Sequence, residues 1–303
     1  MDIPQKLVEN AERVFGDRAR AWLPGLPGVA AACRDRWDLA EGIPAPHMSM
    51  NYIELTTTAE DCPVALKIGV PHDDLYTEME ALRAYDGQAA VGFIDSDHDL
   101  GAILMDRVQP GTMLFQSGCD DAEQTRLAGA IMRELPVTVP QEHGMPHLTD
   151  QVAKAFTRNR TTPELAGTMP EELMQTAEDL LRQLLTDEPT EILLHGDLHH
   201  ENILLDEQRG WLAIDPKGVI GPRAYQPARF LNNRLPEGSS EKHADMTRLR
   251  LDILSEILDC PSATLAAAAF LDRILGTSWS LEDEGTFDMA PALANAHMLQ
   301  RFL

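Results

Sequence analysis

HGDLHHEN at residues 195–202 and IDPK at residues 214–217 carry two acids and an amide at a spacing that suits phosphoryl transfer. The carboxylate of Asp197 can accept a proton from a substrate hydroxyl. Asn202 and Asp215 can hold magnesium against the phosphates of a nucleotide, because amide and carboxylate oxygens are ligands that this ion prefers. Catalytic loops that transfer phosphate divide the work in this way, with D-x4-N followed by a second metal-binding acid. The two motifs therefore predict Asp197 as a catalytic base and Asn202 and Asp215 as metal ligands.

The sequence around these motifs predicts a strand, a loop and a hairpin. Residues 191–194 form a short apolar run, which places the first motif in a loop at the end of a strand. Residues 202–206 and 211–215 have the composition of two further strands, and the turn-like sequence EQRG joins them. Because a hairpin returns the chain to its starting point, we expect Asn202 and Asp215 to meet at one ion.

Two other interpretations of the first motif stay open from the sequence. Asp, Asn and His next to Gly are common turn residues, so a purely structural loop would explain part of the pattern. A zinc site is the second alternative, because His195, Asp197, His199 and His200 lie close together. No His-x-x-x-His helix with a neighbouring Glu accompanies them, as zinc hydrolases of that type require. We expect His195 to brace the loop through hydrogen bonds rather than to bind metal.

A strand that carries one cation, on the face opposite its apolar residues, is predicted around residue 67. Its residues fall on two faces, with Val64, Leu66, Ile68 and Val70 on one and Ala65, Lys67 and Gly69 on the other. The apolar face must pack inward, while the other face leaves room for a flat base and one ammonium group that reaches a phosphate. The alternative is an edge strand that a lysine protects from aggregation. We expect Lys67 to be the nucleotide lysine.

An amphipathic helix is predicted to follow, with Asp73 or Asp74 as its N-cap. Two glutamates on this helix could pair with Lys67. At about 100° per residue, Glu78 lies beside the apolar stripe of the helix, whereas Glu80 projects away from it. We therefore expect Glu78 to pair with Lys67 and to fix its ammonium group for the nucleotide phosphates.

Residues 106–111 contain Pro and Gly and are the candidate hinge between two lobes. Backbone groups near Arg107 and Val108 are candidates to hydrogen-bond adenine. No G-x-G-x-x-G sequence covers the phosphates. Ser49 and Asn51, which offer a hydroxyl, an amide and backbone N–H groups, are the candidates for that role.

The order of these elements predicts an α+β fold with two lobes. Residues 1–105 would form a small, β-rich nucleotide-binding lobe, and residues 106–111 the hinge. Residues 112–303 would form a larger helical lobe that carries the catalytic loop and the substrate site. Helical apolar spacing over residues 120–135, and two helices expected at about 240–260 and 261–276, support this assignment.

Composition limits the partners of the chain. Its 303 residues are 44% hydrophobic and carry a formal net charge of −24, which repels nucleic acid and anionic membranes. The acidity favours a cationic small molecule as substrate, although it could also serve only solubility. No run approaches the ~18–20 apolar residues of a membrane span, and the first residues lack the apolar core of a secretory signal. The four cysteines have no CxxC spacing. We expect a cytoplasmic protein that binds neither nucleic acid nor membranes; its oligomeric state stays open.

The chain resembles the aminoglycoside and choline kinase-like family, and more narrowly its streptomycin 6-phosphotransferase and hydroxyurea-resistance group. The residues that carry the resemblance are VALKIG at 64–69, EMEALRAYDG at 78–87, GAILMDR at 101–107, PGT at 110–112, the two motifs within 195–205 and 214–218, AY at 224–225 and FLNN at 230–233. The resemblance implies a bilobal protein-kinase-like fold that holds ATP and Mg²⁺ between its lobes. Gln226 departs from the family pattern, which has an acid after the tyrosine.

By this resemblance, Asp197 takes the position of the base, Asn202 and Asp215 those of the metal ligands, and Lys67 with Glu78 that of the phosphate-anchoring pair. The implied activity is ATP-dependent phosphorylation of a hydroxyl on a small, cationic molecule, with a streptomycin-like aminoglycoside favoured. A metabolite kinase acting on an amino alcohol or sugar is the alternative. A nucleotide-binding pseudokinase is a third possibility, although such proteins often lose a residue that this chain keeps. Lys217 could face the phosphates or form a salt bridge on its loop.

Overall fold

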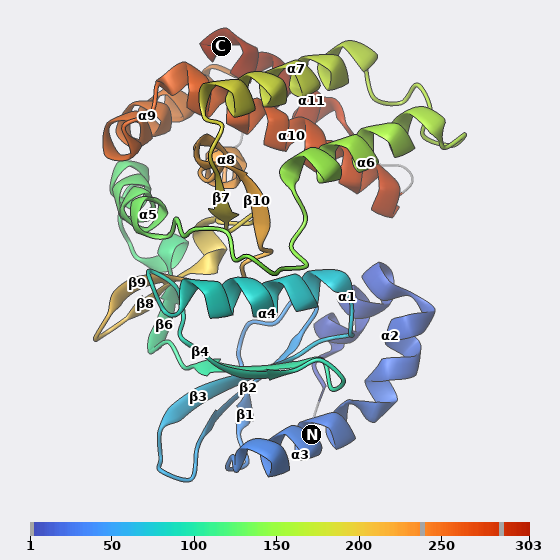
Figure 1. The fold of residues 1–303 in the computed structure, drawn as a ribbon, viewed down its shortest axis with the longest axis vertical. Coiled ribbons are helices and arrows are strands. Elements are labelled where there is room, and N and C mark those ends of the chain that lie inside the picture. Colours follow the sequence, from blue (N-terminus) through green and yellow to red (C-terminus); the bar gives the residue numbers. More distant parts are fainter. Residues whose placement is uncertain (1–2, 237–239, 285–287) are drawn as a thin grey trace. The chain divides into compact units, whose positions relative to one another are not determined.

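The structure, a computed structural model, describes residues 3–236, 240–284 and 288–303. The chain divides into two compact units, of which the N-terminal unit ends at Gln109 and the C-terminal unit begins at Pro110. This boundary falls inside residues 106–111. The N-terminal unit is built around a five-stranded sheet, and the C-terminal unit is mainly helical (Figure 1), so the α+β class is confirmed.

Within its described residues, the N-terminal unit contains one antiparallel sheet and four α-helices. The strands lie in the order β1-β2-β3-β5-β4. Their bounds are β1 (Ile43–Pro44), β2 (Tyr52–Thr57), β3 (Pro63–Ile68), β4 (Phe93–Asp97) and β5 (Ala102–Asp106). The helices are α1 (Gln5–Phe15), α2 (Asp17–Trp22), α3 (Leu26–Trp37) and α4 (Asp73–Tyr85).

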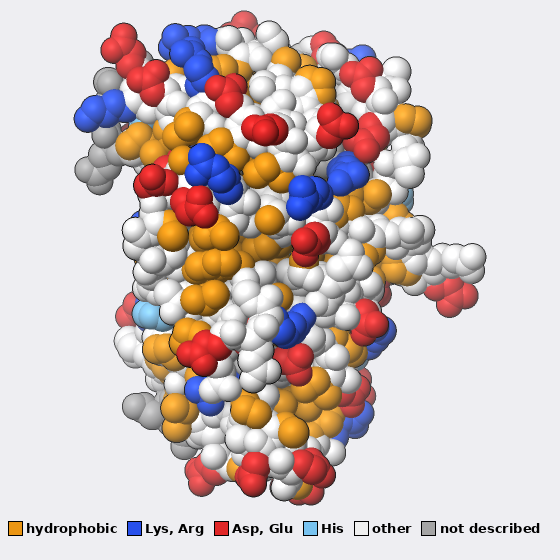
Figure 2. Space-filling model, turned by 90° about the vertical axis from the view of Figure 1, so that its left-hand side faces the viewer, with side chains coloured by type: hydrophobic (Ala, Val, Ile, Leu, Met, Phe, Trp, Pro, Cys, Tyr) orange, Lys and Arg blue, Asp and Glu red, His pale blue; other side chains and the backbone are white. Residues whose placement is uncertain are grey.

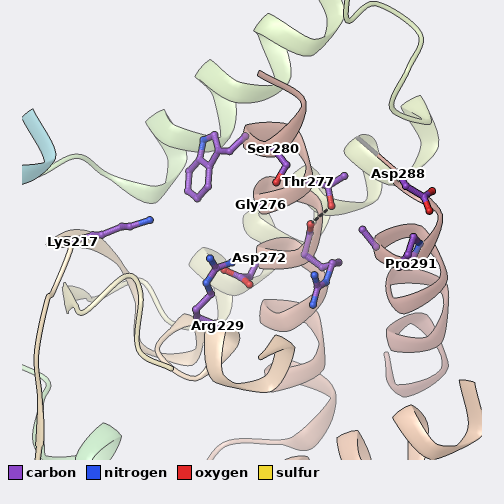
Figure 3. A pocket seen from close by; sticks show the side chains of 11 residues that line it. Lys217, Arg229, Asp272, Gly276, Thr277, Ser280, Asp288 and Pro291 are labelled. Carbon is purple, nitrogen blue, oxygen red and sulfur yellow. Dashed lines mark hydrogen bonds between the residues drawn. The ribbon is translucent and has the colours of Figure 1, made fainter. Parts of the chain in front are cut away.

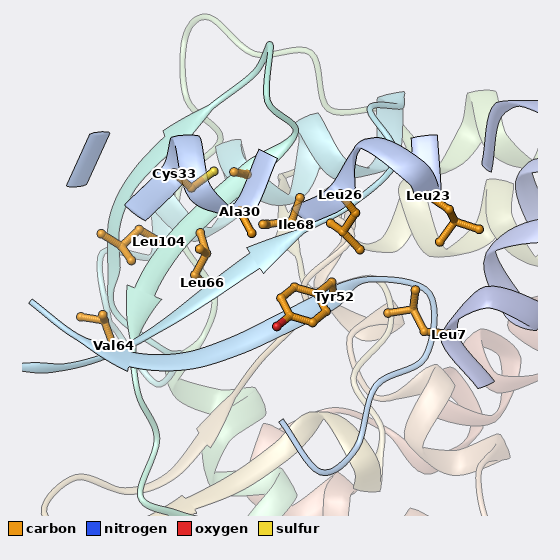
Figure 4. Close-up of a cluster of buried hydrophobic side chains, with 11 residues drawn as sticks. Leu7, Leu23, Leu26, Ala30, Cys33, Tyr52, Val64, Leu66, Ile68 and Leu104 are labelled. Atoms are coloured by element: carbon orange, nitrogen blue, oxygen red, sulfur yellow. The ribbon is translucent and has the colours of Figure 1, made fainter. Parts of the chain in front are cut away.

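Strand β3 lies in the middle of this sheet, so the edge-strand interpretation of Lys67 is wrong. Its apolar residues Val64, Leu66 and Ile68 belong to a buried cluster with side chains of α1 and α3 (Figure 4). Because successive side chains of a strand point to opposite faces, Lys67 lies on the other face, where it contacts α4. The alternation predicted for β3 is therefore present and separates the apolar core from the lysine.

The sequence pattern placed some boundaries differently. A strand that sequence analysis did not delimit, β2, begins at Tyr52. His72 is the N-cap of α4, and Asp73 and Asp74 lie in its first turn. There their negative charges interact favourably with the positive end of the helix dipole. The helices α1, α2 and α3 were not predicted as elements. They supply much of the apolar surface that covers one face of the sheet.

The C-terminal unit contains seven α-helices and two small sheets within its described residues. The helices are α5 (Asp121–Glu134), α6 (Leu148–Thr161), α7 (Glu171–Asp187), α8 (Ala228–Asn232), α9 (Ser240–Leu258), α10 (Ser262–Glu284) and α11 (Ala290–Leu299). The strands are β6 (Pro110–Met113), β7 (Glu191–Leu194), β8 (Ile203–Asp206), β9 (Gly210–Ala213) and β10 (Val219–Pro222). β6, β8 and β9 form one sheet, and β7 pairs with β10.

Helix α10 is central to this unit. It contacts α6, α7, α8, α9 and α11, and its segment 265–271 is buried. This segment falls in the most apolar run of the sequence, and its burial shows that the run is core. No single helix within the described ranges has the length and hydropathy to cross a membrane, although α9 and α10, bent by 116° at their break, meet the criteria as a pair.

A buried arginine fixes the short helix α8. Arg250 of α9 is fully buried and forms an ion pair with Asp121 at the start of α5, with an NH2–Oδ1 distance of 2.6 Å. Its NH1 group also donates to the carbonyl oxygens of Phe230 and Asn233, at 3.1 and 2.7 Å. These bonds satisfy carbonyl groups at the end of α8, the helix that carries Arg229.

The acidic character of the chain is spread over its surface. On the face that Figure 2 shows, acidic side chains are interspersed with basic and hydrophobic ones. The net charge of −24 is thus a poor guide to the charge at any one site. The charge of a binding site has to be taken from the residues that line it.

Candidate active site

The β8–β9 hairpin brings the two candidate metal ligands together. The N–H of Ile214 donates to the carbonyl oxygen of Asn202 at 2.9 Å, which continues the strand pairing up to the residue before Asp215. Asn202 and Asp215 therefore lie at the same end of the hairpin, as predicted. The Nδ2 group of Asn202 donates to the backbone oxygen of Asp197 at 3.0 Å, which ties the amide to the loop of the candidate base.

These two side chains fit a magnesium ion by their chemistry. The Nδ2 group of Asn202 is engaged with the loop, so the amide offers its oxygen as the possible ligand. Asp215 adds a carboxylate from a left-handed backbone conformation, with φ of +57°. Mg²⁺ is commonly held by one or two protein oxygens together with substrate phosphates and water. The pair is therefore a suitable protein contribution to such a site.

His195 braces the loop, as expected. The side chain is fully buried, and this burial lowers its pKa to about 4, so the ring is neutral at neutral pH. Its Nε2 lies 2.9 Å from the carbonyl oxygen of Ile214, which can only accept, and therefore Nε2 carries the proton. Its Nδ1 then accepts the N–H of Asp197 at 3.3 Å. The ring connects the catalytic loop to the end of β9.

The other two histidines of the motif also have protein partners. His199 Nδ1 lies 2.9 Å from Oε2 of Glu201. His200 is buried, stacks on Phe230 and donates from Nδ1 to Oδ1 of Asn233 at 2.7 Å. Both rings thus have a local structural role in holding the loop against its surroundings.

The backbone conformation at Gly196 and the atoms around it both favour glycine at this position. Its φ is +79°, a conformation that residues with a side chain rarely adopt. A Cβ atom at this position would lie 2.9 Å from Cγ2 of Val219 and 3.2 Å from Cβ of Lys217. The glycine thus allows the loop to turn directly before Asp197 while β10 passes close to it.

Asp197 is surrounded by basic groups. Its Oδ1 accepts from Nε of Arg229 at 3.0 Å, and its Oδ2 lies 4.0 Å from Nζ of Lys217 and 3.8 Å from Nε2 of His199. Burial opposes the negative charge, but Lys217 and Arg229 outweigh this effect and hold the pKa of Asp197 below its ordinary value. The carboxylate is therefore ionised near neutral pH and can accept a hydrogen bond from a hydroxyl.

The predicted Lys67–Glu78 pair forms in the N-terminal unit. Nζ of Lys67 lies 2.6 Å from Oε1 and 2.8 Å from Oε2 of Glu78, and both side chains are buried. β3 supplies the lysine and α4 the glutamate, so the pair also joins the helix to the sheet. Such a pair holds an ammonium group in a fixed position, as the anchoring of nucleotide phosphates requires.

Ser49 and Asn51 lie in the segment before β2. The side chain of Asn10 donates to the backbone oxygen of Ser49 at 3.2 Å. Oδ1 of Asn51 is buried and has no hydrogen-bond partner among the described residues. A Cβ at Gly69 would lie 2.4 Å from this oxygen, so the glycine makes room for the amide. The phosphate-covering role of the segment stays a prediction.

Arg107 and Val108 follow β5 directly, at the end of the N-terminal unit. The N–H of Arg107 donates to the carbonyl oxygen of Pro63 at 3.3 Å, which continues the pairing of β3 with β5. Contact of this backbone with a nucleotide base stays a prediction.

A pocket of about 420 Å³ lies within the C-terminal unit (Figure 3). Its lining residues are Lys217, Arg229, Asp272, Arg273, Gly276, Thr277, Trp279, Ser280, Asp288, Pro291 and Ala292. Lys217 and Arg229 connect the pocket to the candidate base, because both also contact the carboxylate of Asp197. A molecule bound in this pocket would therefore lie next to side chains that contact Asp197.

Sequence reasoning missed Arg229 and Arg273. Arg229 lies on a short helix, directly before the FLNN segment but not part of it, and Arg273 lies in an apolar helix far along the chain. Gln226, the departure from the family pattern, is buried and accepts the N–H of His195 at 3.1 Å through Oε1. In this structure its side chain supports the catalytic loop, and its Nε2 has no partner within the described residues.

Comparison with known proteins extends these findings. Residues 36–284 match the family described as aminoglycoside/hydroxyurea antibiotic resistance kinase. A streptomycin 6-kinase of Streptomyces griseus is 29% identical over 96% of this chain and 94% of its own length. A hydroxyurea phosphotransferase of Kitasatospora aureofaciens is also 29% identical, over 93% of this chain and 81% of its own.

The fold is likewise shared with a solved structure. A thermostable mutant of the aminoglycoside phosphotransferase APH(4)-Ia, in a ternary complex with ADP and hygromycin B, has a TM-score of 0.61 at 13% identity. The match covers 90% of this chain and 97% of that one, which confirms the protein-kinase-like fold. The expected enzyme class, a small-molecule kinase, is confirmed by the full-length relatives. Since the family match extends over residues 36–284, well beyond half of the sequence, this chain belongs to the aminoglycoside/hydroxyurea antibiotic resistance kinase family.

Proposed function

We propose that this protein transfers the γ-phosphate of ATP to a hydroxyl group of a small molecule, with magnesium as the metal. The observation that carries the proposal is the arrangement of Asp197, Asn202 and Asp215. Asn202 is hydrogen-bonded to the loop of Asp197 and is paired with the residue before Asp215. One base and two metal ligands at the end of one hairpin are the protein groups that phosphoryl transfer requires.

In this proposal Asp197 orients the acceptor hydroxyl and takes its proton, a role worth about 10²–10⁴-fold in rate. Its low pKa keeps it ionised at neutral pH, so it is ready to accept a hydrogen bond. Asn202 and Asp215 would hold magnesium, which would offset the negative charge of the β- and γ-phosphates. His195 keeps the loop in place through its neutral ring.

The nucleotide side of the proposal belongs to the N-terminal unit. Its residues are Lys67 and Glu78 for the phosphates, Ser49 and Asn51 for phosphate cover, and the backbone of Arg107 and Val108 for the base. The Lys67–Glu78 pair supports this assignment, because a buried ammonium group that a carboxylate holds in place is positioned for an anionic ligand. Asn51 supports it through a buried oxygen that lacks a partner in the described part of the chain.

Two classes of acceptor are proposed. Streptomycin-like aminoglycosides come first, because full-length relatives are named streptomycin 6-kinase. A metabolite with a hydroxyl group comes second, and the basic side chains beside Asp197 favour it. A nucleotide-binding protein without transfer activity would phosphorylate neither kind of acceptor.

The test is magnesium-dependent release of ADP by the purified protein against a panel of acceptors. The panel holds streptomycin, other aminoglycosides, amino alcohols, sugars, sugar acids and hydroxyurea. We expect one acceptor to stimulate ADP release and Asp197→Asn to abolish the stimulation, since the amide cannot take the proton. Stimulation that survives in Asp197→Asn would contradict the assigned base. Tight ATP binding without stimulation by any acceptor would favour a binding protein.

A further inference from the structure

Cations outnumber carboxylates among the described residues that line the pocket beside Asp197, and two of these cations also contact the carboxylate of Asp197. Among its described lining residues, the cations are Lys217, Arg229 and Arg273, and the carboxylates are Asp272 and Asp288. Figure 3 shows Arg229 and Asp272 close together and Lys217 extending toward the residues of α10. A site for a polycationic ligand would be expected to have the opposite balance.

The carboxylate of Asp272 is already occupied by protein groups. Its Oδ1 accepts from the hydroxyl of Tyr225 at 3.2 Å, and its Oδ2 accepts from Nδ2 of Asn232 at 2.9 Å. The residue is 5% exposed, so the charge serves the buried network of α8 and α10 rather than a ligand. It offers little to an incoming ammonium or guanidinium group.

Asp288 does not reverse the balance. The residue is exposed, and its Oδ1 accepts from the N–H of Ala290 at the beginning of α11. A carboxylate that is surrounded by water interacts weakly with a charged ligand, because the high dielectric constant screens it. Its local role is to satisfy a free N–H group at a helix terminus.

Arg273 has no carboxylate partner within the described part of the chain. Its Nε donates to Oδ1 of Asn295 at 3.0 Å and its NH2 to the carbonyl oxygen of Asn232 at 2.8 Å. Both acceptors are neutral, and no described carboxylate lies within salt-bridge distance of this guanidinium. Its burial, together with the neighbouring Arg229, lowers its pKa although Asp272 acts in the other direction. A partly desolvated guanidinium gains most from a ligand oxyanion that it can bind through two N–H groups.

One wall of the pocket suits a carbon skeleton. Trp279 lines it, with its ring 5.6 Å from Nζ of Lys217, so the ring and the ammonium group form a cation–π pair. An aromatic wall next to fixed cations is the usual composition of a site for a small molecule with an apolar body and a charged end.

We propose that the acceptor of this kinase carries an oxyanion group, a carboxylate or a phosphate, which Arg273 and Arg229 bind while an acceptor hydroxyl reaches Asp197. The inference rests on the proposed function and, of its two classes of acceptor, selects the metabolite, as a hydroxy acid or a phosphorylated alcohol, over a streptomycin-like aminoglycoside. An oxyanion that engages Arg229 also releases Oδ1 of Asp197 for the hydroxyl, because Arg229 occupies this oxygen in the structure. Acceptor binding and the exposure of the base are thereby coupled.

The test measures anion binding without nucleotide, so its outcome does not depend on transfer activity. The full-length protein is titrated with malonate and, separately, with inorganic phosphate, at constant ionic strength in sodium chloride. The readout is tryptophan fluorescence, and Trp279→Phe identifies the part of the signal that comes from the pocket. Arg273→Gln removes the proposed binding group, and Arg182→Gln, an exposed arginine paired with Asp179 on α7, is the matched control.

We expect saturable binding of at least one anion that Arg273→Gln weakens about tenfold or more and Arg182→Gln leaves unchanged, as the loss of a charge-assisted bidentate contact implies. Response to malonate alone assigns a carboxylate, and response to phosphate alone assigns a phosphate ester. Absence of saturation, or equal affinity in Arg273→Gln and the parent with equal melting temperatures, overturns the proposal. Displacement of malonate by streptomycin from the Trp279 site also overturns it.

The outcome for anion binding can be distinguished from the outcome for the proposed phosphate transfer. If anion binding fails while ATP-dependent transfer to an aminoglycoside succeeds, the kinase assignment stands and the acceptor class is wrong. If anion binding succeeds in a protein that transfers phosphate to no acceptor of the panel and to no hydroxy acid or phosphorylated alcohol, the pocket is an anion site and the proposed reaction is wrong.

Discussion

Arg229 donates its Nε–H to Oδ1 of Asp197 at 3.0 Å, so one oxygen of the candidate base is bound to a guanidinium group. The other oxygen lies 4.0 Å from Nζ of Lys217. Both cations also line the pocket of the C-terminal unit. The pKa of Asp197 is therefore lowered by two side chains that also line the pocket.

Arg229→Gln is expected to raise the pKa of Asp197. Lys217 and Arg229 hold this pKa low against the effect of burial, so removal of one cation leaves burial to act more strongly. Asp197 works as the ionised form, and activity is lost as the pH falls through its pKa. The acidic limb of the profile of kcat/KM against pH should therefore move to higher pH. An acidic limb at the same pH as in the parent would show that Asp197 does not titrate there.

Lys67→Met should weaken ATP binding and also destabilise the N-terminal unit. The substitution leaves the carboxylate of Glu78 buried without its cation, which typically costs about 3–5 kcal/mol. The double variant Lys67→Met/Glu78→Gln removes both charges and should recover much of the stability but none of the ATP affinity. Urea unfolding and nucleotide titration separate the two effects. Full ATP affinity in the stable double variant would show that the pair is structural only.

Gly196→Ala should reduce turnover far more than Gly210→Ala. Both glycines have positive φ values, +79° and +81°, so each alanine costs about 1–2 kcal/mol of backbone strain. A Cβ at Gly196 also meets Val219 at 2.9 Å next to the catalytic loop, whereas nothing lies within 4 Å at Gly210. Unfolding experiments and steady-state assays test this. Equal losses of turnover in the two variants would mean that the loop tolerates displacement before Asp197.

The local elements of the site could be predicted because their signals are local. Alternation over β3 placed Lys67 opposite the apolar core, and helical spacing selected Glu78 as its partner, which the ion pair confirms. The hairpin followed from two short strands and a polar turn, and β7 occupies residues 191–194 as expected. In each case the residues that determine the structure lie within a few positions of one another.

The pocket could not be predicted, because it depends on residues far apart in the chain. Arg229 and Arg273 meet there only after α8 and α10 have packed together. No periodicity or motif marks either arginine, and overall acidity pointed to a cationic ligand. The helices α1 to α3 were also missed. Pro27 and Gly28 lie in the first turn of α3, where proline is tolerated, and α3 buries Leu26, Ala30 and Cys33 in the cluster that covers the sheet.

The two buried histidines of the catalytic loop should make the C-terminal unit sensitive to acid. Burial lowers the pKa of His195 and of His200 from 6.5 to about 4. Between pH 6.5 and pH 4 the two histidines are protonated in the unfolded chain and stay neutral in the folded chain. Their contribution to the free energy of unfolding is therefore fully present above about pH 6.5 and falls as the pH decreases toward 4. The slope is about 1.4 kcal/mol per pH unit for each histidine at most.

Urea unfolding at several pH values between 7 and 4.5 measures this slope. His200→Gln keeps a neutral donor for Asn233 but cannot be protonated, so it should lower the slope by the contribution of one histidine. His297→Gln, at an exposed position on α11, should leave the slope unchanged. A parent whose stability is constant over this range would show that the rings accept protons in the folded state. The hydrogen bond from Nε2 of His195 to Ile214 would then no longer define a neutral ring, and the description of the loop would have to change.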